Sequence, residues 1–409
     1  MSDIRKDARS IINAALKAAM PDSTVRHGLE SLPGYKGSLI LVSIGKAAWQ
    51  MAKAALEAGV KPEKGIVITK YAHIPSPLPG LELFEAGHPI PDEGSCTAAG
   101  RALELTAGLS ADDLVLVLIS GGASALFEAP LVPLEELADV TAQLLSCGAS
   151  ITEINTIRKR LSSVKGGKFA RHCAPAKVYS IILSDVLGDV PDMIASGPTC
   201  ADPSSSAQAV AIAEKYSLRL SDRVWELLKE ETPKRLDNAA FSMSGSVRGL
   251  CLAAAEQCRT LGYESHILTD CLDCQAREAG AFMAAIARFH RDRSCPMAFI
   301  AGGETVVKLI GKGKGGRNQE LALSAAAGIA DLEKTLLFSL GSDGTDGPTD
   351  AAGGMVTGDT AAELKAQGLD IGTVLDNNDA YHALERCGGL IITGPTGTNV
   401  NDVCCLLLG

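Results

Sequence analysis

The sequence lacks any apolar run as long as a membrane-spanning helix. One of the longest runs, Leu114–Ile119, has the length of a buried strand. An excess of positive charge is also missing, because 38 basic and 48 acidic residues give 38 − 48 = −10. An acidic balance argues against nucleic acid or an anionic membrane as the main partner. If the ligand is an anion, positive charge must be concentrated locally.

A complete zinc-binding motif is missing too. The twelve cysteines are scattered, mostly within apolar segments, which predicts free thiols in a reducing cytoplasm. Cys271 and Cys274 form a C-x-x-C motif, but a zinc site would need a second ligand pair. There is no G-x-S-x-G motif, so a hydrolase nucleophile is not supported. Four histidines are interpreted as structural: His73, His88, His172 and His266.

What the sequence does contain is an alternation of strand-like and helix-like segments. Eight short apolar segments are expected to be strands: 38–44, 65–69, 114–119, 178–183, 265–268, 297–300, 336–340 and 390–392. Strands of this kind between helices predict an α/β fold with parallel sheets covered on both faces. The polar stretch 230–235 is the candidate boundary, which gives an N-terminal domain over 1–235 and a C-terminal domain over 236–409. The opening residues from Asp3 to Arg9 are mixed in charge, so no secretory signal is expected.

Many of the expected strands end in a glycine-bearing turn. The turns lie at 43–46, 120–124, 301–304, 341–347 and 393–399. Ligands of open α/β sheets bind at the carboxyl ends of the strands. Turns on both sides of the boundary therefore predict an active site in a cleft between two domains.

The segment 311–320, GKGKGGRNQE, is a candidate anion site. It lies between a strand-like run, 305–310, and a helix-like run, 319–330, and it carries Lys312, Lys314 and Arg317. Glycines let the backbone approach a ligand, and a helix start offers N–H groups to a phosphate or carboxylate. The loop matches the P-loop motif imperfectly and G-x-G-x-x-G formally. The alternative is a flexible surface hairpin with solvated lysines.

Lysine and aspartate residues follow other strands. Lys46 lies between a strand and a helix, where its ammonium could hold a phosphoryl or carboxylate oxygen. Asp343 and Asp346 lie on a loop that suits one or two ligands for Mg²⁺, or alternatively an Asx-rich turn. Asp185 and Asp189 form a second acidic loop.

Two further segments complete the inventory. Residues 120–124, SGGAS, are similar to an anion-binding nest with hydroxyl groups. The basic helix over 155–168 has two readings, a solvated face or a substrate clamp. Cations on glycine loops, acidic loops and no nucleophile–base pair together fit phosphoryl transfer, which needs mainly positioning and charge neutralisation.

These motifs, taken in order, resemble the class II glycerate kinases (glycerate 2-kinase, the MOFRL family). The resemblance covers nearly the whole chain and rests on SIGKAA at 43–48, GHPIPD at 87–92, SGGAS at 120–124, LSDVLGD at 183–189, ASGPT at 195–199, GKGGRNQE at 313–320, GSDGTDG at 341–347 and TGPTGTN at 393–399. It implies an N-terminal Rossmann-like domain, a C-terminal MOFRL domain and an active site in the cleft between them.

The resemblance also implies an activity. The expected reaction is phosphorylation of D-glycerate at its 2-hydroxyl by ATP, with Mg²⁺, to give 2-phosphoglycerate and ADP. Lys46 and Arg317 correspond to the family's cleft lysine and arginine, and Asp343 and Asp346 lie on its glycine-rich acidic loop. An NAD(P)H-dependent hydroxypyruvate reductase is the alternative enzyme, and a two-domain sensor of an organic acid is the non-enzymatic alternative.

The candidate site residues follow from these loops. The candidate catalytic residues are Lys46, Arg317, Asp343 and Asp185, and the candidate metal ligands are Asp343 and Asp346. The candidate substrate- or phosphate-binding residues are Gly45, Ser120, Gly121, Gly122, Ser124, Asp189, Glu304, Lys314, Gly315, Gly316, Asn318, Thr396 and Asn399. A cytoplasmic location is expected, with small molecules as partners and neither nucleic acid nor membrane. A homodimer is left open.

Overall fold

The structure, a computed structural model, describes residues 3–188 and 190–409, so the candidate binding residue Asp189 lies outside the described residues. The chain divides into two compact units. The first unit is Thr24–Ser244, and the second is the chain up to Ser23 together with Gly245–Gly409. The division expected from the sequence, 1–235 and 236–409, differs at the boundary and at the first helix.

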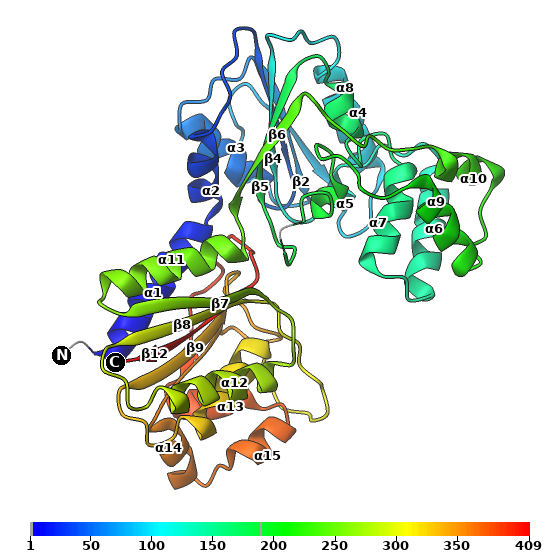
Figure 1. The fold of residues 1–409 in the computed structure, drawn as a ribbon. Helices are drawn as coiled ribbons and strands as arrows, with labels where there is room; N and C mark the ends of the chain where they lie inside the picture. The colour runs from blue at the N-terminus through cyan, green and yellow to red at the C-terminus, as the bar shows by residue number, and fades with distance from the viewer. Residues whose placement is uncertain (1–2, 189) are drawn as a thin grey trace. The chain divides into compact units, whose positions relative to one another are not determined.

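Helix α1 (Ile4–Ala19) explains the second difference, because it packs on α11 (Val247–Thr260) within the second unit (Figure 1). One face of α1 is apolar and buried through Ala8, Ile11, Ile12, Ala15 and Ala19. The Tyr263 hydroxyl donates to Asp7 at 2.9 Å, which adds a buried polar contact. These contacts join residues that are distant in the sequence, so the boundary composition could not reveal them.

The described residues of the first unit form one six-stranded sheet in the order β3-β2-β1-β4-β5-β6. The strands are β1 (Leu39–Ile44), β2 (Lys64–Lys70), β3 (Glu82–Ala86), β4 (Leu114–Ile119), β5 (Lys177–Leu183) and β6 (Ala239–Gly245). Strands β1 to β5 pair in parallel. This is the strand order of doubly wound Rossmann folds, in which ligands bind where the order reverses, here beyond the ends of β1 and β4.

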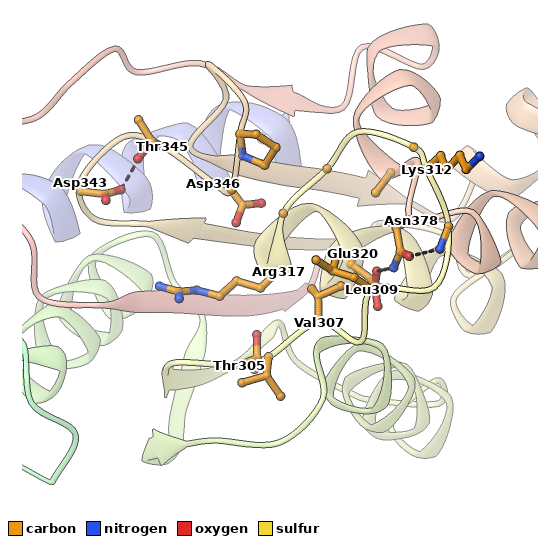
Figure 2. A pocket seen from close by; sticks show the side chains of 18 residues that line it. Thr305, Val307, Leu309, Lys312, Arg317, Glu320, Asp343, Thr345, Asp346 and Asn378 are labelled. Carbon is orange, nitrogen blue, oxygen red and sulfur yellow. Dashed lines mark hydrogen bonds between the residues drawn. The ribbon is translucent and has the colours of Figure 1, made fainter. Parts of the chain in front are cut away.

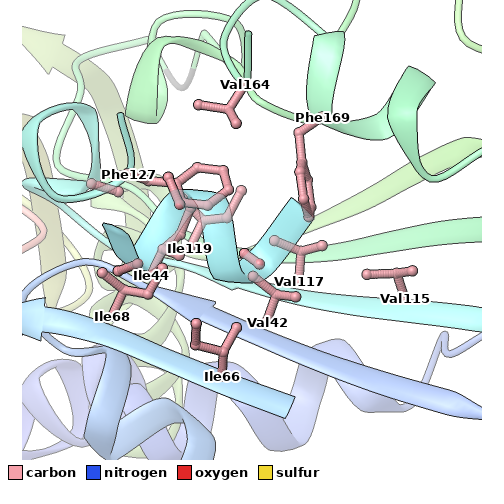
Figure 3. Packing of buried hydrophobic residues seen from close by; sticks show 14 of the residues in the cluster. Val42, Ile44, Ile66, Ile68, Val115, Val117, Ile119, Phe127, Val164 and Phe169 are labelled. Carbon is pink, nitrogen blue, oxygen red and sulfur yellow. The ribbon is translucent and has the colours of Figure 1, made fainter. Parts of the chain in front are cut away.

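Helices cover this sheet, and a separate helical group extends from it. The helices are α2 (Pro21–Leu29), α3 (Ala48–Glu57), α4 (Glu93–Leu105), α5 (Ala123–Leu126), α6 (Leu134–Ser146), α7 (Ile151–Arg160), α8 (Lys168–His172), the 3₁₀ helix η1 (Ile194–Ser196), α9 (Ser206–Lys215) and α10 (Asp222–Lys229). Figure 3 shows β-branched side chains of β1, β2 and β4 packed under Phe127 and Phe169, whose rings meet edge to face at 5.2 Å. Helices α6, α7, α9 and α10 share a core of their own.

The sheet of the second unit, over the described residues, has the order β11-β10-β9-β12-β8-β7. Its strands are β7 (Glu264–Leu272), β8 (Met297–Gly303), β9 (Thr335–Gly341), β10 (Gly353–Thr357), β11 (Leu390–Ile391) and β12 (Asp402–Leu408). The expectation of a parallel sheet is wrong here, because β12 lies between β8 and β9 and runs antiparallel to both. Strand β10 is also antiparallel to β9 and to β11.

Two helix layers enclose this sheet (Figure 1). Helices α1 and α11 lie over one face, and α12 (Ala276–Phe289) and α13 (Arg317–Gly328) lie over the other. The remaining helices are α14 (Thr360–Ala366), α15 (Ile371–Asp376) and α16 (Ala380–Arg386). No helix in the described part of the chain is both long and apolar enough to cross a membrane.

Candidate functional site

A cavity of about 680 Å³ lies in the second unit against the loops that follow β8 and β9. Figure 2 shows its lining, with Asp343, Thr345 and Arg317 toward one end and Val307, Leu309 and Lys312 toward the other. The volume falls within the range of roughly 300–1,000 Å³ that small-molecule sites occupy. The cavity is therefore large enough for a nucleotide or a small acid.

Arg317 is the first residue of α13 and the cation with the best-defined partners in this cavity. Its Nε and Nη2 donate to the two carboxylate oxygens of Asp402 at 2.6 and 3.0 Å. Its Nη1 donates to Glu304 at 2.7 Å. A guanidinium has five N–H donors, so these three bonds leave one donor on each of Nη1 and Nη2. Arg317 can therefore still offer two N–H groups to an anion.

Asp402, the partner of Arg317, is only 6% exposed. Burial raises the pKa of Asp402 to about 6, although the bonds from Arg317 act in the opposite direction. Burial alone would lower the pKa of Arg317, but its bonds to Asp402 and Glu304 raise it. The pair thus fixes the guanidinium while keeping it charged.

Sequence reasoning missed Asp402 because it missed β12. The register pairs Asp402 with Gly303 of β8 and with Gly341 of β9, so an antiparallel strand brings its first residue to the carboxyl ends of its two neighbours. The apolar run after Asp402 was a signal for this strand. Its direction could not be predicted from a pattern that indicated parallel pairing.

Asp346 makes contacts that the sequence did not predict. Its carboxylate accepts the backbone N–H groups of Asn318 and Gln319, in the first turn of α13, at 3.2 and 2.9 Å. Burial raises the pKa of Asp346, and these two bonds oppose the rise. The anion position at the start of α13 is thus taken by a side chain of the protein. Asn318 is also internal, since its side-chain oxygen accepts from Ser339 at 2.6 Å.

The glycine loop before α13 bonds to another part of the second unit. The N–H groups of Ile310 and Gly311 both donate to the Asn378 side-chain oxygen at 2.8 Å. Gly313 donates to the Asn377 carbonyl at 2.8 Å. A Cβ on Gly311 would lie 2.2 Å from backbone atoms of Asn377, so that glycine is required by packing. These N–H groups therefore do not form the phosphate nest that the sequence suggested.

The strand expected at 305–310 is not formed. Strand β8 ends at Gly303 and α13 begins at Arg317, with an isolated bridge at Val306 between them. A dinucleotide fingerprint requires its glycines to lie in a direct strand-to-helix turn. The G-x-G-x-x-G match is thus coincidental. Lys314 is held over the ring of Tyr381 with its ammonium 4.1 Å from the centroid.

The two glycine-rich loops after β9 and β11 pack against each other. One Asp343 carboxylate oxygen accepts the Thr345 N–H at 2.9 Å, and the Asp343 carbonyl accepts the Thr396 N–H at 3.2 Å. Gly344 has a φ of +87°, and a Cβ there would lie 2.0 Å from the Gly394 carbonyl oxygen. The Asn399 side chain accepts from the backbone of its own loop. The Asx turn expected as an alternative is present, and it holds Asp343 at the cavity.

In the first unit, the turns after β1 and β4 are joined by hydrogen bonds. Lys46 N–H donates to the Gly121 carbonyl at 3.0 Å, and Ala47 N–H donates to the Ser120 hydroxyl at 3.0 Å. Gly45 has a φ of +118°, and a Cβ there would lie 2.3 Å from the Ser120 hydroxyl oxygen. The structure thus brings Gly45, Lys46, Ser120 and Gly121 together at the point where the strand order reverses.

His88 and Asp185 lie beside these turns. A Cβ on Gly122 would lie 3.0 Å from both His88 and the Lys46 side chain, and a Cβ on Gly121 would lie 2.2 Å from an Asp185 carboxylate oxygen. Burial lowers the pKa of His88, and the charges of Lys46 and Lys70 lower it further. His88 was interpreted as structural from the sequence, although it lies within the GHPIPD motif at 87–92.

The basic segment 155–168 is not a solvated face, because most of its cations are buried, and α7 ends within it at Arg160. Lys159 is buried and bonds Asp192 and Asp202 at 2.7 and 3.1 Å, while Lys165 is buried against Glu128 at 3.0 Å. Burial lowers the pKa of Lys165 to about 8, and Glu128 opposes this. These cations therefore form ion pairs in the interior of the first unit.

The same helix positions Ser124. Arg158 Nη2 donates to the Ser124 carbonyl at 3.1 Å, and the Ser124 hydroxyl lies 3.1 Å from the Ser196 hydroxyl. Ser196 in turn donates to Asn155 at 3.0 Å. Side chains of helix α7 thus hold the turn after β4 in place.

Comparison with known proteins identifies the family of this chain. A domain of unknown function, DUF4147, matches residues 7–229, and the MOFRL family matches residues 297–402. The D-glycerate 2-kinase of Thermotoga maritima is 50% identical over 98% of this chain and 97% of its own. This chain belongs to the glycerate 2-kinase family.

Two more comparisons bear on the family's fold and naming. The crystal structure of a glycerate kinase from Thermotoga maritima superposes with a TM-score of 0.94 over 99% of both chains, at 50% identity. A relative from Agrobacterium vitis, 40% identical over 99% of this chain and 94% of its own, carries the name putative hydroxypyruvate reductase. Relatives of this chain therefore carry two functional names, one for a kinase and one for a reductase.

Proposed function

We propose that this chain is an ATP-dependent kinase that phosphorylates D-glycerate at its 2-hydroxyl, giving 2-phosphoglycerate and ADP. The proposal rests mainly on the geometry of Arg317. Its guanidinium is fixed by Asp402 and still has two N–H donors at a cavity of about 680 Å³. Two donors on one planar group suit the oxygens of a phosphoryl group or a carboxylate. Phosphoryl transfer depends mainly on such positioning and charge stabilisation.

The charges around Arg317 support Mg²⁺ as part of the substrate. Arg317 contributes +1, while Glu304, Asp402 and Asp343 contribute −3 when ionised, so the group has a charge of 1 − 3 = −2. A bare polyphosphate would be repelled by this surplus more strongly than its magnesium complex, which has a smaller negative charge. Asp343 would hold the ion, because Mg²⁺ is usually bound by one or two carboxylates together with substrate phosphates and waters. Bound Mg²⁺ would neutralise charge on the transferring group.

Asp346 is less suited to this role than the sequence suggested. Its carboxylate already caps α13 through Asn318 and Gln319. Within the described residues, no group of three or more His, Cys, Asp or Glu side chains is arranged around a common metal position. We therefore expect the ion to be held by Asp343 and the nucleotide phosphates.

Lys46 and Asp185 are proposed to act on the acceptor. The Lys46 ammonium would neutralise negative charge on glycerate or on the transferring phosphoryl group. Asp185 would orient the 2-hydroxyl and take its proton as the oxygen forms its bond to phosphorus and the bond to ADP breaks. An active site between the two domains, as expected from the sequence, stays a prediction.

No feature of the described residues favours the reductase. Its sequence support was Gly311, Gly313 and Gly316, and all three approach protein atoms so closely that a Cβ would clash. The deciding experiment supplies ATP, Mg²⁺ and D-glycerate and identifies the product by phosphorus NMR. We expect 2-phosphoglycerate. Oxidation of NAD(P)H with hydroxypyruvate, in the absence of any phosphorylated product, would overturn the proposal.

A further inference from the structure

The segment between β8 and the glycine loop exposes apolar side chains at the cavity. Val306 is 54% exposed and Leu309 is 81% exposed, and both line the cavity together with Val307. Apolar side chains grouped at the edge of a cavity are a common mark of a ligand surface. We call Val306, Val307 and Leu309 the apolar wall.

The backbone of the apolar wall is held in place, so this exposure is not the result of a loose loop. Val306 N–H donates to the Cys274 carbonyl at 3.0 Å, and the Val306 carbonyl accepts the Ala276 N–H at 2.9 Å. At the other end, the Asn378 amide nitrogen donates to the Lys308 carbonyl at 3.2 Å, and its oxygen accepts from Ile310 at 2.8 Å. A surface fixed at both ends loses little entropy when it binds a ligand.

Thr305 adds an independent polar observation. It is 4% exposed and lines the cavity, and its hydroxyl has no hydrogen-bond partner among the described residues. A buried hydroxyl without a partner is unfavourable, and a ligand hydroxyl could satisfy it. In Figure 2 Thr305 lies between Arg317 and the Val307 side chain.

The order of these groups matches the order of parts in a nucleotide. Along the cavity in Figure 2, Asp343 and Arg317 come first, Thr305 follows, and Val307 and Leu309 come last. Phosphates would meet the charged end, a ribose hydroxyl the Thr305 hydroxyl, and a flat base the apolar wall. We propose that the apolar wall is the binding surface for the purine base of the phosphoryl donor, which is an inference that rests on the proposed kinase function.

Photoaffinity labelling tests this placement without any substitution. The full-length protein is irradiated with 8-azido-ATP and Mg²⁺, whose reactive group is on the base, and the labelled peptide is identified by mass spectrometry. We expect the label within residues 305–310, and we expect excess ATP to prevent it. A protected label in any other peptide would overturn the proposal.

A double substitution measures the contribution of the base. In Val306→Ser/Leu309→Ser, we expect the Kd of MgADP to rise roughly tenfold because apolar contact area is lost. The Kd of magnesium tripolyphosphate, which has no base, should stay within about twofold of its starting value. Leu252→Ser is the matched control, because Leu252 is 50% exposed on α11 in the same unit and does not line the cavity.

The outcomes separate this proposal from the proposed function. Equal losses for MgADP and tripolyphosphate, or no loss for MgADP, would overturn the base site. If glycerate is phosphorylated but the label lies elsewhere, the base site fails and the kinase function stands. If the label lies at 305–310 but no glycerate is phosphorylated, the kinase function fails and the base site stands.

Discussion

The substitution Asp402→Asn tests whether Asp402 holds the Arg317 guanidinium in its orientation. It preserves the side chain's size but places an amide N–H₂ or a single oxygen opposite Nε and Nη2, which now donate to two carboxylate oxygens. Arg317 would lose its fixed orientation. Loss of a well-placed charge-stabilising group costs roughly 10²–10³ in kcat. We therefore expect a decrease of that size in kcat, measured by coupled detection of ADP.

The same substitution has a signature in the pH dependence of stability. The native pKa of Asp402 is about 6, against 3.8 for an unperturbed carboxyl, a difference of 6 − 3.8 = 2.2 units. At 1.36 kcal/mol per unit this is about 3 kcal/mol. Because the native state holds the proton more tightly than the unfolded state, this contribution is fully present below about pH 4 and is lost as the pH rises to about 6.

The free energy of unfolding of wild type minus that of Asp402→Asn should therefore fall by about 2.4 kcal/mol between pH 4 and pH 7, because other titrating groups cancel in the difference. Urea unfolding at several pH values measures it. Asp292→Asn is the control, since Asp292 is exposed in the same unit. If this difference in the free energy of unfolding did not depend on pH, or if Asp402→Asn had a normal kcat, Asp402 would not have the role that we assign to it.

Three other substitutions address separate parts of the molecule. Lys46→Ala should reduce kcat by roughly 10²–10³ while the melting temperature stays nearly unchanged, as measured by ADP release and calorimetry; normal turnover would remove Lys46 from the mechanism. Glu128→Ala should destabilise the protein by about 3–5 kcal/mol in urea unfolding, because Lys165 would be left as a buried unpaired cation; a change below about 1 kcal/mol would contradict that pairing. Gly121→Ala should displace Asp185, which lies 2.2 Å from the position of the new Cβ, and lower kcat at least tenfold; unchanged turnover would show that Asp185 has no part in the reaction.

The central strands of the first unit could be predicted well from local sequence, whereas its edge strands β3 and β6 were missed. Strands β1 and β4 are continuous apolar runs followed by glycines, and such runs are typical of central parallel strands. The turns containing Lys46 and Ser120 follow directly from these strands. Their contact across the sheet depends on the parallel pairing of β1 with β4, which the sequence alone did not give.

The second unit was harder to predict, for a physical reason. Strand β12, at the end of the chain, is inserted between β8 and β9, and no local pattern gives the neighbours or direction of a strand. The partner of Arg317 depended on that insertion. The glycine loop misled for a related reason, since its glycines make room for Asn377 and Asp379, more than sixty residues later.

The sequence also failed to predict that several charged side chains are buried. Lys159, Arg160 and Lys165 resemble an exposed basic face when the sequence is read alone. Each is buried beside a carboxylate that lies elsewhere in the chain, such as Asp202 or Glu128. Pairing of this kind over long sequence distances cannot be detected without the fold.

The most direct test of the account follows the phosphorus NMR spectrum of ATP, Mg²⁺ and D-glycerate with the wild-type enzyme and with Arg317→Lys. The lysine retains the charge but cannot bond Asp402 in two places and an anion with two further N–H groups. We expect 2-phosphoglycerate from the wild type and a rate at least about 10²-fold lower from the variant. A different phosphorylated product, or a variant as fast as the wild type, would contradict the account.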